Sequence, residues 1–181
     1  MIWKPNVTVA AVIEQNGKYL LVEEEPELGA GLFLNQPAGH LDPGESIIQG
    51  AIRETLEETA YTFVPEHLLG IYQWHSRRVD TTYLRFAFCG RVTDHDPARE
   101  LDKGILRADW FSVEEINQAA QRHRSPLVMQ CIRDHIAGKR YPLALLTHYE
   151  FGRHEKEARR ARHVGWRGFI GRRLLAQTAR L

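Results

Sequence analysis

Residues 39–61 of the chain read GHLDPGESIIQGAIRETLEETAY. Asp42 is a residue type that caps helices, Pro43 suits a first helical position, and Glu45 follows three residues after Asp42. Residues suited to a buried stripe then recur every three or four positions, at Ile48, Ala51, Ile52 and Thr55. We therefore predict an amphipathic helix that is capped by Asp42 and runs to about Thr59.

Three glutamates share another face of this predicted helix: Glu54, Glu57 and Glu58. Each like-charged pair at this spacing costs about 0.2–0.5 kcal/mol when it is not screened. Solvent and the neighbouring Arg53 are enough to offset this cost, and acidic helix faces are common. The spacing alone therefore favours a solvated acidic surface. The alternative is a divalent cation site, because Mg²⁺ prefers oxygen ligands and is usually held by one or two carboxylates together with substrate phosphates.

The segment just before the helix, Pro37-Ala38-Gly39-His40, has the composition of a turn. Glycine permits backbone angles that other residues avoid, and turn carbonyls are further candidate ligands for a hard cation. Because this segment lies close to the glutamates along the chain, we expect substrate and metal to meet there.

Strands and helices alternate along the rest of the first 150 residues. The turn signal at Gln15-Asn16-Gly17-Lys18 predicts a hairpin. Capping signals at Ser112 and Ser125 predict two helices, which end near Gln121 and at Gly138. The order indicates a mixed α/β or α+β domain. The predicted strands span residues 7–13, 19–22, 32–34, 68–74, 82–92 and 109–111.

The composition is that of a globular protein, with 43% hydrophobic and 26% charged residues, which excludes collagen-like and wholly disordered classes. The net charge of +1 conceals an asymmetry. Residues 1–150 carry 15 Lys and Arg against 21 Asp and Glu, whereas residues 151–181 carry 9 against 2. We therefore predict one domain over residues 1–150 and a basic C-terminal extension over residues 151–181, helical or disordered.

Two cysteines, Cys89 and Cys131, are too few for a disulfide framework, and neither has a zinc-binding spacing. They are interpreted as inert packing residues in a reducing compartment. The N-terminal residues do not resemble a signal peptide, and no apolar run approaches the roughly 20 residues of a membrane helix. These features predict a cytoplasmic protein without a transmembrane segment.

The stretch 39–61 resembles the Nudix box, which is a glycine, five residues, a glutamate, seven residues, Arg-Glu, two residues and Glu-Glu. This match makes the solvated acidic face the weaker interpretation. Thr55 departs from the usual aliphatic residue and is tolerable if its hydroxyl bonds back to a helical carbonyl. Ala60 departs from the usual glycine and is strained if the chain needs a positive φ there. The matching residues are Gly39, Glu45, Arg53, Glu54, Glu57 and Glu58.

Further segments resemble the NudJ phosphatase branch of this family, over roughly residues 1–146. The resemblance implies an α/β fold, a Nudix-type α/β/α sandwich with a mixed sheet. It also implies Mg²⁺-dependent hydrolysis, with Mn²⁺ as a substitute. The bonds cut would be phosphoanhydrides in nucleoside di- and triphosphates, thiamine pyrophosphate or hydroxymethylpyrimidine pyrophosphate. The segments are residues 35–41, 73–74, 84–86, 124–128 and 140–143.

The resemblance also assigns metal ligands. Glu57 and Glu58 are the expected ligands, with the Ala38 carbonyl as a third. Glu54 is expected to be a further ligand or the general base, a role that typically contributes about 10² to 10⁴ in rate. Arg53 belongs to the catalytic set and either orients a glutamate or touches the substrate.

Two acids have two interpretations each. Glu45 is a metal ligand or a group that braces the loop before the helix. Asp102, in the segment Leu101-Asp102-Lys103-Gly104-Ile105, is a further acid of the site or a solvated loop residue.

The substrate has its own candidate residues. Trp74 stacks on a pyrimidine or thiazolium ring or belongs to the core. Arg85 meets a phosphate or forms a structural ion pair. His40 bonds a phosphate, acts as an acid, or is structural. The full set is Asn35, Gln36, Gly39, His40, Trp74 and Arg85.

Residues 153–173 carry basic side chains interleaved with apolar ones, and the resemblance does not cover them. They are a solvated or disordered tail, a contact with nucleic acid or acidic membrane, or an oligomer or lid element. Beside a small-molecule hydrolase, two alternatives stay open: an RNA 5′-pyrophosphohydrolase assisted by the tail, and a non-catalytic nucleotide sensor. The intact Glu54, Glu57 and Glu58 argue against the sensor.

Overall fold

The computed structural model describes residues 3–25 and 31–149. Its elements are β1 (Asn6–Gln15), β2 (Lys18–Glu24), β3 (Phe33–Asn35), β4 (Ala38–His40), α1 (Ile47–Thr59), β5 (Tyr61–Ser76), β6 (Thr81–His95), β7 (Ile105–Ser112), α2 (Val113–Gln118), the 3-10 turn η1 (Ala120–Arg122), α3 (Leu127–Ile136) and the 3-10 turn η2 (Leu143–Leu145). The sheet has the order β3-β2-β1-β6-β5, while β4 pairs with β1 and β7 with β2. Strand β1 is parallel to β6 and antiparallel to β2 and β4, so the sheet is mixed.

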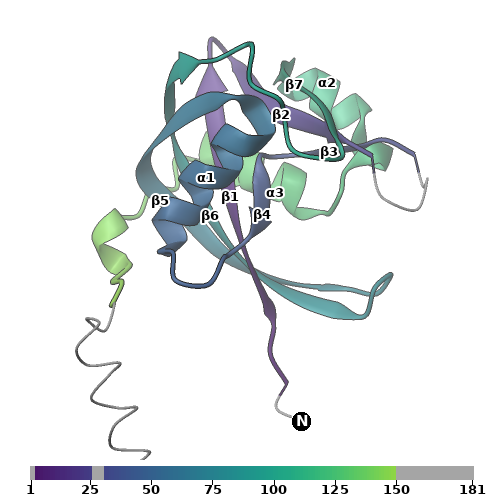
Figure 1. The fold of residues 1–181 in the computed structure, drawn as a ribbon. Coiled ribbons are helices and arrows are strands. Elements are labelled where there is room, and N and C mark those ends of the chain that lie inside the picture. The colour runs from purple at the N-terminus through teal and green to yellow at the C-terminus, as the bar shows by residue number, and fades with distance from the viewer. Residues whose placement is uncertain (1–2, 26–30, 150–181) are drawn as a thin grey trace, which may run out of the picture. The chain divides into compact units, whose positions relative to one another are not determined.

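The helices cover both faces of this sheet, with α1 on one and α2 and α3 on the other (Figure 1). Successive residues of a strand point to opposite faces. Val9 of β1 therefore packs in the cluster that contains Ala51 of α1. Its neighbour Ala10 packs in the cluster that contains Ile132 of α3. Both faces of the central strand are buried, and the predicted α/β/α sandwich is confirmed.

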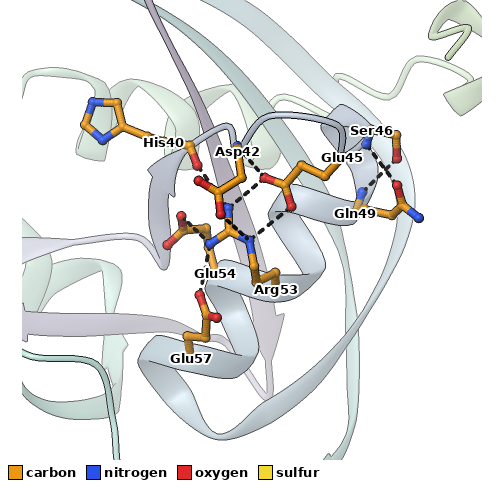
Figure 2. A network of polar contacts seen from close by, with 8 residues as sticks. All are labelled: His40, Asp42, Glu45, Ser46, Gln49, Arg53, Glu54 and Glu57. Atoms are coloured by element: carbon orange, nitrogen blue, oxygen red, sulfur yellow. Dashed lines mark hydrogen bonds and ion pairs between the residues drawn. The ribbon is translucent and has the colours of Figure 1, made fainter. Parts of the chain in front are cut away.

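The start of α1 was predicted wrongly. The helix begins at Ile47, and the Ser46 hydroxyl caps it by accepting the Gln49 N–H at 3.1 Å (Figure 2). The Gln49 side chain in turn accepts the Ser46 N–H at 2.9 Å. Asp42 instead opens a turn in which Gly44 has a φ of +93°. A residue with this φ cannot continue a helix from an Asp42 cap.

Strands β5 and β6 are longer than their predicted ranges of 68–74 and 82–92. Pro65 does not end β5, because β5 lies at the edge of the sheet and its register shifts between Pro65 and His67. The hairpin formed by β5 and β6 extends away from α1 in Figure 1. Residues 77–80 form its tip.

Several local predictions are confirmed. Ser112 and Glu115 form a capping box at the start of α2. The helix predicted from Ser125 to Gly138 is α3, but it spans Leu127–Ile136, Pro126 is at its cap position without a side-chain cap, and Gly138 lies beyond its end with a φ of +75°. Both cysteines are free and buried.

All of these elements belong to the compact unit Met1–Thr147. In the ranges that the structure describes, no helix is both long and apolar enough to cross a membrane. The basic extension predicted for residues 151–181 lies outside the described residues. Its role, its boundary and the cytoplasmic location stay predictions.

Glu23 of β2 forms ion pairs with two neighbouring elements. Its carboxylate accepts hydrogen bonds from Arg107 of β7, at 2.6 Å, and from Arg122 of η1. The Arg107 hydrogen bond is the main cause that lowers the pKa of Glu23, Arg122 adds to it, and burial opposes both.

Glu23→Gln is expected to lower the free energy of unfolding by about 1–3 kcal/mol at neutral pH. Because the folded pKa is depressed, this contribution is complete above the unfolded pKa and is lost as pH falls through the folded pKa. Urea unfolding at neutral pH and at about pH 3 measures it. A difference between wild type and variant that does not shrink in acid would contradict the ion-pair origin.

Candidate active site

Arg53 is the centre of a network in which one guanidinium donates hydrogen bonds to three carboxylates and lies 3.8 Å from a fourth, that of Asp42 (Figure 2). Its Nη2 donates to Glu45 at 2.7 Å, and its Nη1 donates to Glu54 at 2.8 Å and to Glu57 at 2.9 Å. The Glu45 hydrogen bond is the main cause that raises the pKa of Arg53, so the group stays charged. Arg53 also donates to the His40 carbonyl at 3.0 Å, which joins α1 to β4.

Glu45 braces the loop before α1. One of its oxygens accepts the Asp42 N–H at 2.7 Å, and both oxygens accept from Arg53. The Arg53 hydrogen bond is the main cause that lowers the pKa of Glu45. The structure therefore gives Glu45 the geometry of the bracing alternative.

Gly39 lies directly against Glu54. A Cβ built on Gly39 would stand 2.2 Å from the Glu54 carboxyl atoms. The expected reason for this glycine, an unusual φ in a turn, is wrong, because residues 38–40 form strand β4 and Gly39 pairs with Val9. The glycine is needed because the Glu54 carboxyl comes so close to β4.

Glu58 is buried behind this contact. Its Oε2 accepts the Ala38 N–H at 2.8 Å, so Ala38 contacts Glu58 through its amide. Burial raises the pKa of Glu58 well above the usual value, and the charges of Glu54, Glu24 and Asp102 raise it further. Burial also raises the pKa of Glu54, against the opposing effect of Arg53. Arg53 offsets part of the charge of Glu54, and the Ala38 N–H offsets part of that of Glu58, while both pKa values stay raised.

An acidic pocket of about 180 Å³ opens beside Glu58. Its acids are Glu24, Glu25, Glu58 and Asp102, and it also contains Lys103 and Arg124. Burial raises the pKa of Glu24, and Arg124 opposes this with a contact of 3.4 Å from its Nε to the Glu24 carboxylate. Asp102 is attached to α1 through its N–H, which donates to the Glu57 carbonyl at 3.0 Å.

These carboxylates fit a hard divalent cation in charge and in donor chemistry. Within residues 3–25 and 31–149, no three His, Cys, Asp or Glu side chains are arranged to hold a metal ion by themselves. Mg²⁺ does not require such a cage, since it keeps several waters and shares phosphate oxygens with few carboxylates. Repulsion among Glu54, Glu58 and their acidic neighbours is what such a cation would relieve.

A central pocket of about 260 Å³ adjoins the acidic pocket and shares Glu24 and Arg124 with it. Trp74 and Tyr83 line it as a stacked pair, with ring centroids 5.7 Å apart. His40 lines it too, and its ring lies 6.3 Å from that of Tyr83. The pocket therefore has an aromatic wall next to the carboxylates.

Four residues that line the central pocket each have a buried side-chain atom without a hydrogen-bond partner among the described residues. They are Thr8 with Oγ1, Glu24 with Oε1, Asn35 with Oδ1 and Arg85 with Nη1. Burial lowers the pKa of Arg85, with Glu24 and Glu58 among the charges that oppose this. A buried polar group without a hydrogen bond costs about 1–3 kcal/mol, so these atoms are suited to meet a polar ligand.

One predicted substrate residue does not reach the pocket. Gln36 has no exposed surface, and its side chain donates to the Val128 carbonyl at 2.7 Å. Glu24, Thr8, Tyr83 and Arg124 line the site without having been predicted. Arg124 belonged to a segment that resembled the family, whereas the other three had no local signal.

The two departures from the Nudix box have structural answers. Thr55 donates its hydroxyl to the Ala51 carbonyl at 2.7 Å, as the prediction required. Ala60 ends α1 with a φ of 59°, so the position does take the left-handed conformation that glycine adopts without strain.

Known proteins resemble this chain in sequence and in structure. The family model of the NUDIX domain matches residues 3–130. Phosphatase NudJ of Escherichia coli K12 is 39% identical over 150 residues, which cover 83% of this chain and 95% of that protein. A NUDIX hydrolase from Nitrosomonas europaea has a TM-score of 0.79 and 63% identity, over 81% of this chain and 98% of that one.

More distant structures share the fold alone. A MutT NUDIX hydrolase from Burkholderia pseudomallei has a TM-score of 0.60 at 18% identity, over 73% of this chain and 98% of that chain. The family model covers well over half of the chain, and the curated relative is matched over nearly its whole length. Three glutamates of the box, Glu45, Glu54 and Glu57, form ion pairs with Arg53 of α1. This chain belongs to the Nudix hydrolase family.

Proposed function

We propose that this Nudix hydrolase cuts phosphoanhydride bonds in nucleoside di- and triphosphates or in thiamine-type pyrophosphates, with Mg²⁺ as cofactor. The observation that supports this most is the meeting of two charge environments. Buried carboxylates with raised pKa lie beside a pocket lined by Arg85, whose Nη1 has no hydrogen-bond partner among the described residues. A cation on the first and a phosphate on the second would satisfy both.

The metal ligands that we propose are Glu57 and Glu58, with the Ala38 carbonyl and Glu54 as further candidates and Mn²⁺ as a substitute. Bound there, the cation would neutralise phosphate charge and lower the pKa of the attacking water. Asp102 lines the acidic pocket beside Glu58 and is proposed as a further acid. Glu45 is held by Arg53 and the loop and is proposed as a brace.

Glu54 is our candidate for the general base. Its carboxyl is pressed against Gly39 and held by Arg53, so it has a defined position beside the metal ligands. Its raised pKa is closer to neutral pH than that of an ordinary carboxylate, and a general base is most effective when its pKa is near the working pH. Arg53 acts through the glutamates that it orients and is a positioning residue.

The leaving group is proposed to bind in the central pocket. Nη1 of Arg85 would donate a hydrogen bond to a phosphate of the leaving group. Oδ1 of Asn35 would accept a hydrogen bond from the part of the leaving group beyond that phosphate. The stacked ring of Trp74 faces the same pocket and suits a flat base or a thiazolium ring. His40 and Gly39 complete the lining nearest the carboxylates.

The two alternative functions, a nucleotide sensor and an RNA 5′-pyrophosphohydrolase, now differ in their support. Membership of a hydrolase family removes the support for a non-catalytic sensor. The RNA 5′-pyrophosphohydrolase alternative depended on the basic tail, which lies outside the described residues, and it stays a prediction.

A substrate panel tests the proposed function. Nucleoside diphosphates, nucleoside triphosphates and thiamine pyrophosphate are incubated with Mg²⁺, and phosphate and pyrophosphate are assayed separately. We expect turnover of at least one of them, its loss on chelation by EDTA, and its recovery with Mg²⁺ or Mn²⁺. Turnover that is unchanged by EDTA would contradict the cofactor, and inactivity toward the whole panel would contradict the substrate class.

A further inference from the structure

A basic groove of about 590 Å³ adjoins the central pocket, and the proposed chemistry uses none of its arginines. Its charged side chains are Arg77, Arg78 and Arg124, and no Asp or Glu is among its lining residues. Phe33 and Trp74 supply aromatic surface. This volume is within the range of small-molecule binding sites.

Two of the arginines are ordered by one ring. The Arg78 guanidinium lies 5.4 Å from the centroid of Phe33, and that of Arg124 lies 5.3 Å from it. Such a cation–π contact holds a guanidinium plane while its N–H groups remain available to an anion, as for Arg78. Nε of Arg124 also lies 3.4 Å from the Glu24 carboxylate. Arg77, at the exposed tip of the β5–β6 hairpin, has no hydrogen bond or ion pair within the part of the chain that the structure describes.

The basic groove is the third in a series of adjoining pockets that begins at the acidic pocket. It shares Trp74, Arg78 and Arg124 with the central pocket, which in turn shares Glu24 with the acidic pocket. Charge therefore changes along this series from the cation-binding acids, through the pocket of the leaving group, to a groove that favours anions.

We propose that the basic groove binds a second phosphate group, carried by the substrate on its leaving-group side. This rests on the proposed hydrolysis of a phosphoanhydride, whose bond would lie at the acidic end of the series. Arginine forks match phosphate geometry, and aromatic faces stack on bases that lie next to such phosphates. Two sources share this chemistry: a 3′-phosphate on a nucleotide, and the phosphodiester of a short oligonucleotide.

Binding of product analogues tests the groove without depending on turnover. The titrants are adenosine 5′-monophosphate, adenosine 3′,5′-bisphosphate and the 5′-phosphorylated dinucleotide pApA, and Kd is measured by calorimetry on the full chain. We expect wild type to bind at least one of the two extended ligands about fivefold or more tightly than the monophosphate. Tight binding of both extended ligands would show that the groove recognises the phosphate group itself. Tight binding of pApA alone would show that it recognises an oligonucleotide.

Arg77→Glu is the informative variant, because Arg77 lines the groove and not the central pocket. We expect it to remove the preference for the extended ligands while the Kd of the monophosphate changes less than about twofold. Added salt should weaken the extended ligands more than the monophosphate, since each phosphate contact releases counterions. Arg133→Glu reverses the same charge at an exposed position of α3 and should leave the preference intact.

Three results would overturn the proposal: no preference in wild type, a preference that survives Arg77→Glu, or the same loss in Arg133→Glu. Failure of the proposed hydrolysis is a separate outcome. It would appear as absent turnover in the substrate panel, while the affinities measured here would still show whether the groove selects a second phosphate.

Discussion

Glu57→Gln is expected to lower Mg²⁺-dependent turnover by about 10² to 10⁴, because Glu57 is proposed as a charged ligand of a cation that would supply several kcal/mol to the transition state. The fold should tolerate the change. The Glu57 side chain is 30% exposed, and Arg53 keeps Glu45 and Glu54 as partners. Glutamine also preserves the shape of the side chain. We therefore expect a large kinetic effect with little change in the free energy of unfolding.

Turnover at saturating Mg²⁺ and urea unfolding measure the two quantities. Glu114→Gln is the matched control, since Glu114 is an exposed helical glutamate of α2 that is not among the partners of Arg53. It should keep wild-type turnover. Undiminished turnover in Glu57→Gln would refute its assignment as a ligand, and equal losses in both variants would show that the effect is not specific to the site.

Gly39→Ala is expected to reduce kcat/KM by about 10² or more, through displacement of the proposed base. The added Cβ would stand 2.2 Å from the Glu54 carboxyl, so that carboxyl must move away. Moving it breaks the hydrogen bond from Arg53, which is 2.8 Å long. Stability should fall by only about 1 kcal/mol, because the displaced atoms are the end of a flexible side chain.

A double-mutant cycle with Glu54→Gln shows whether Gly39 acts through Glu54. If it does, the double variant will be no slower than Glu54→Gln alone. Fully additive losses in kcat/KM would contradict this reasoning and would point to a separate contact between the new methyl group and the substrate. Circular dichroism of each variant controls for loss of fold.

Prediction succeeded where the signal is local. The spacing of Glu54, Glu57 and Glu58 is enough to place them on one helix, because helical neighbours lie three and four residues apart. The capping box of Ser112 is equally local. At α1 the predicted Asp42 cap is wrong, because Gly44 has a φ of +93° and Ser46 caps the helix instead.

Prediction failed where contacts join distant segments. The strand predicted over residues 68–74 is longer in the structure, where β5 begins at Tyr61 and an irregular edge strand accommodates Pro65. Gln36 is a polar residue in a segment that resembles the family, yet it is buried and its side chain donates to the Val128 carbonyl. Glu24 is at the end of β2 and had no neighbouring motif that marks it as part of the site.

The Nudix family, the helix that carries the carboxylates and the acidic character of its face all follow from residues 39–61, because periodicity and motif spacing are properties of one short segment. The partners of those carboxylates come from elsewhere in the fold. The pairing of β1 with β4 brings Gly39 against Glu54, and the parallel register of β1 and β6 places Arg85 beside Thr8. Strand register depends on packing across the whole sheet, so the pocket and its basic groove became visible once the chain was folded.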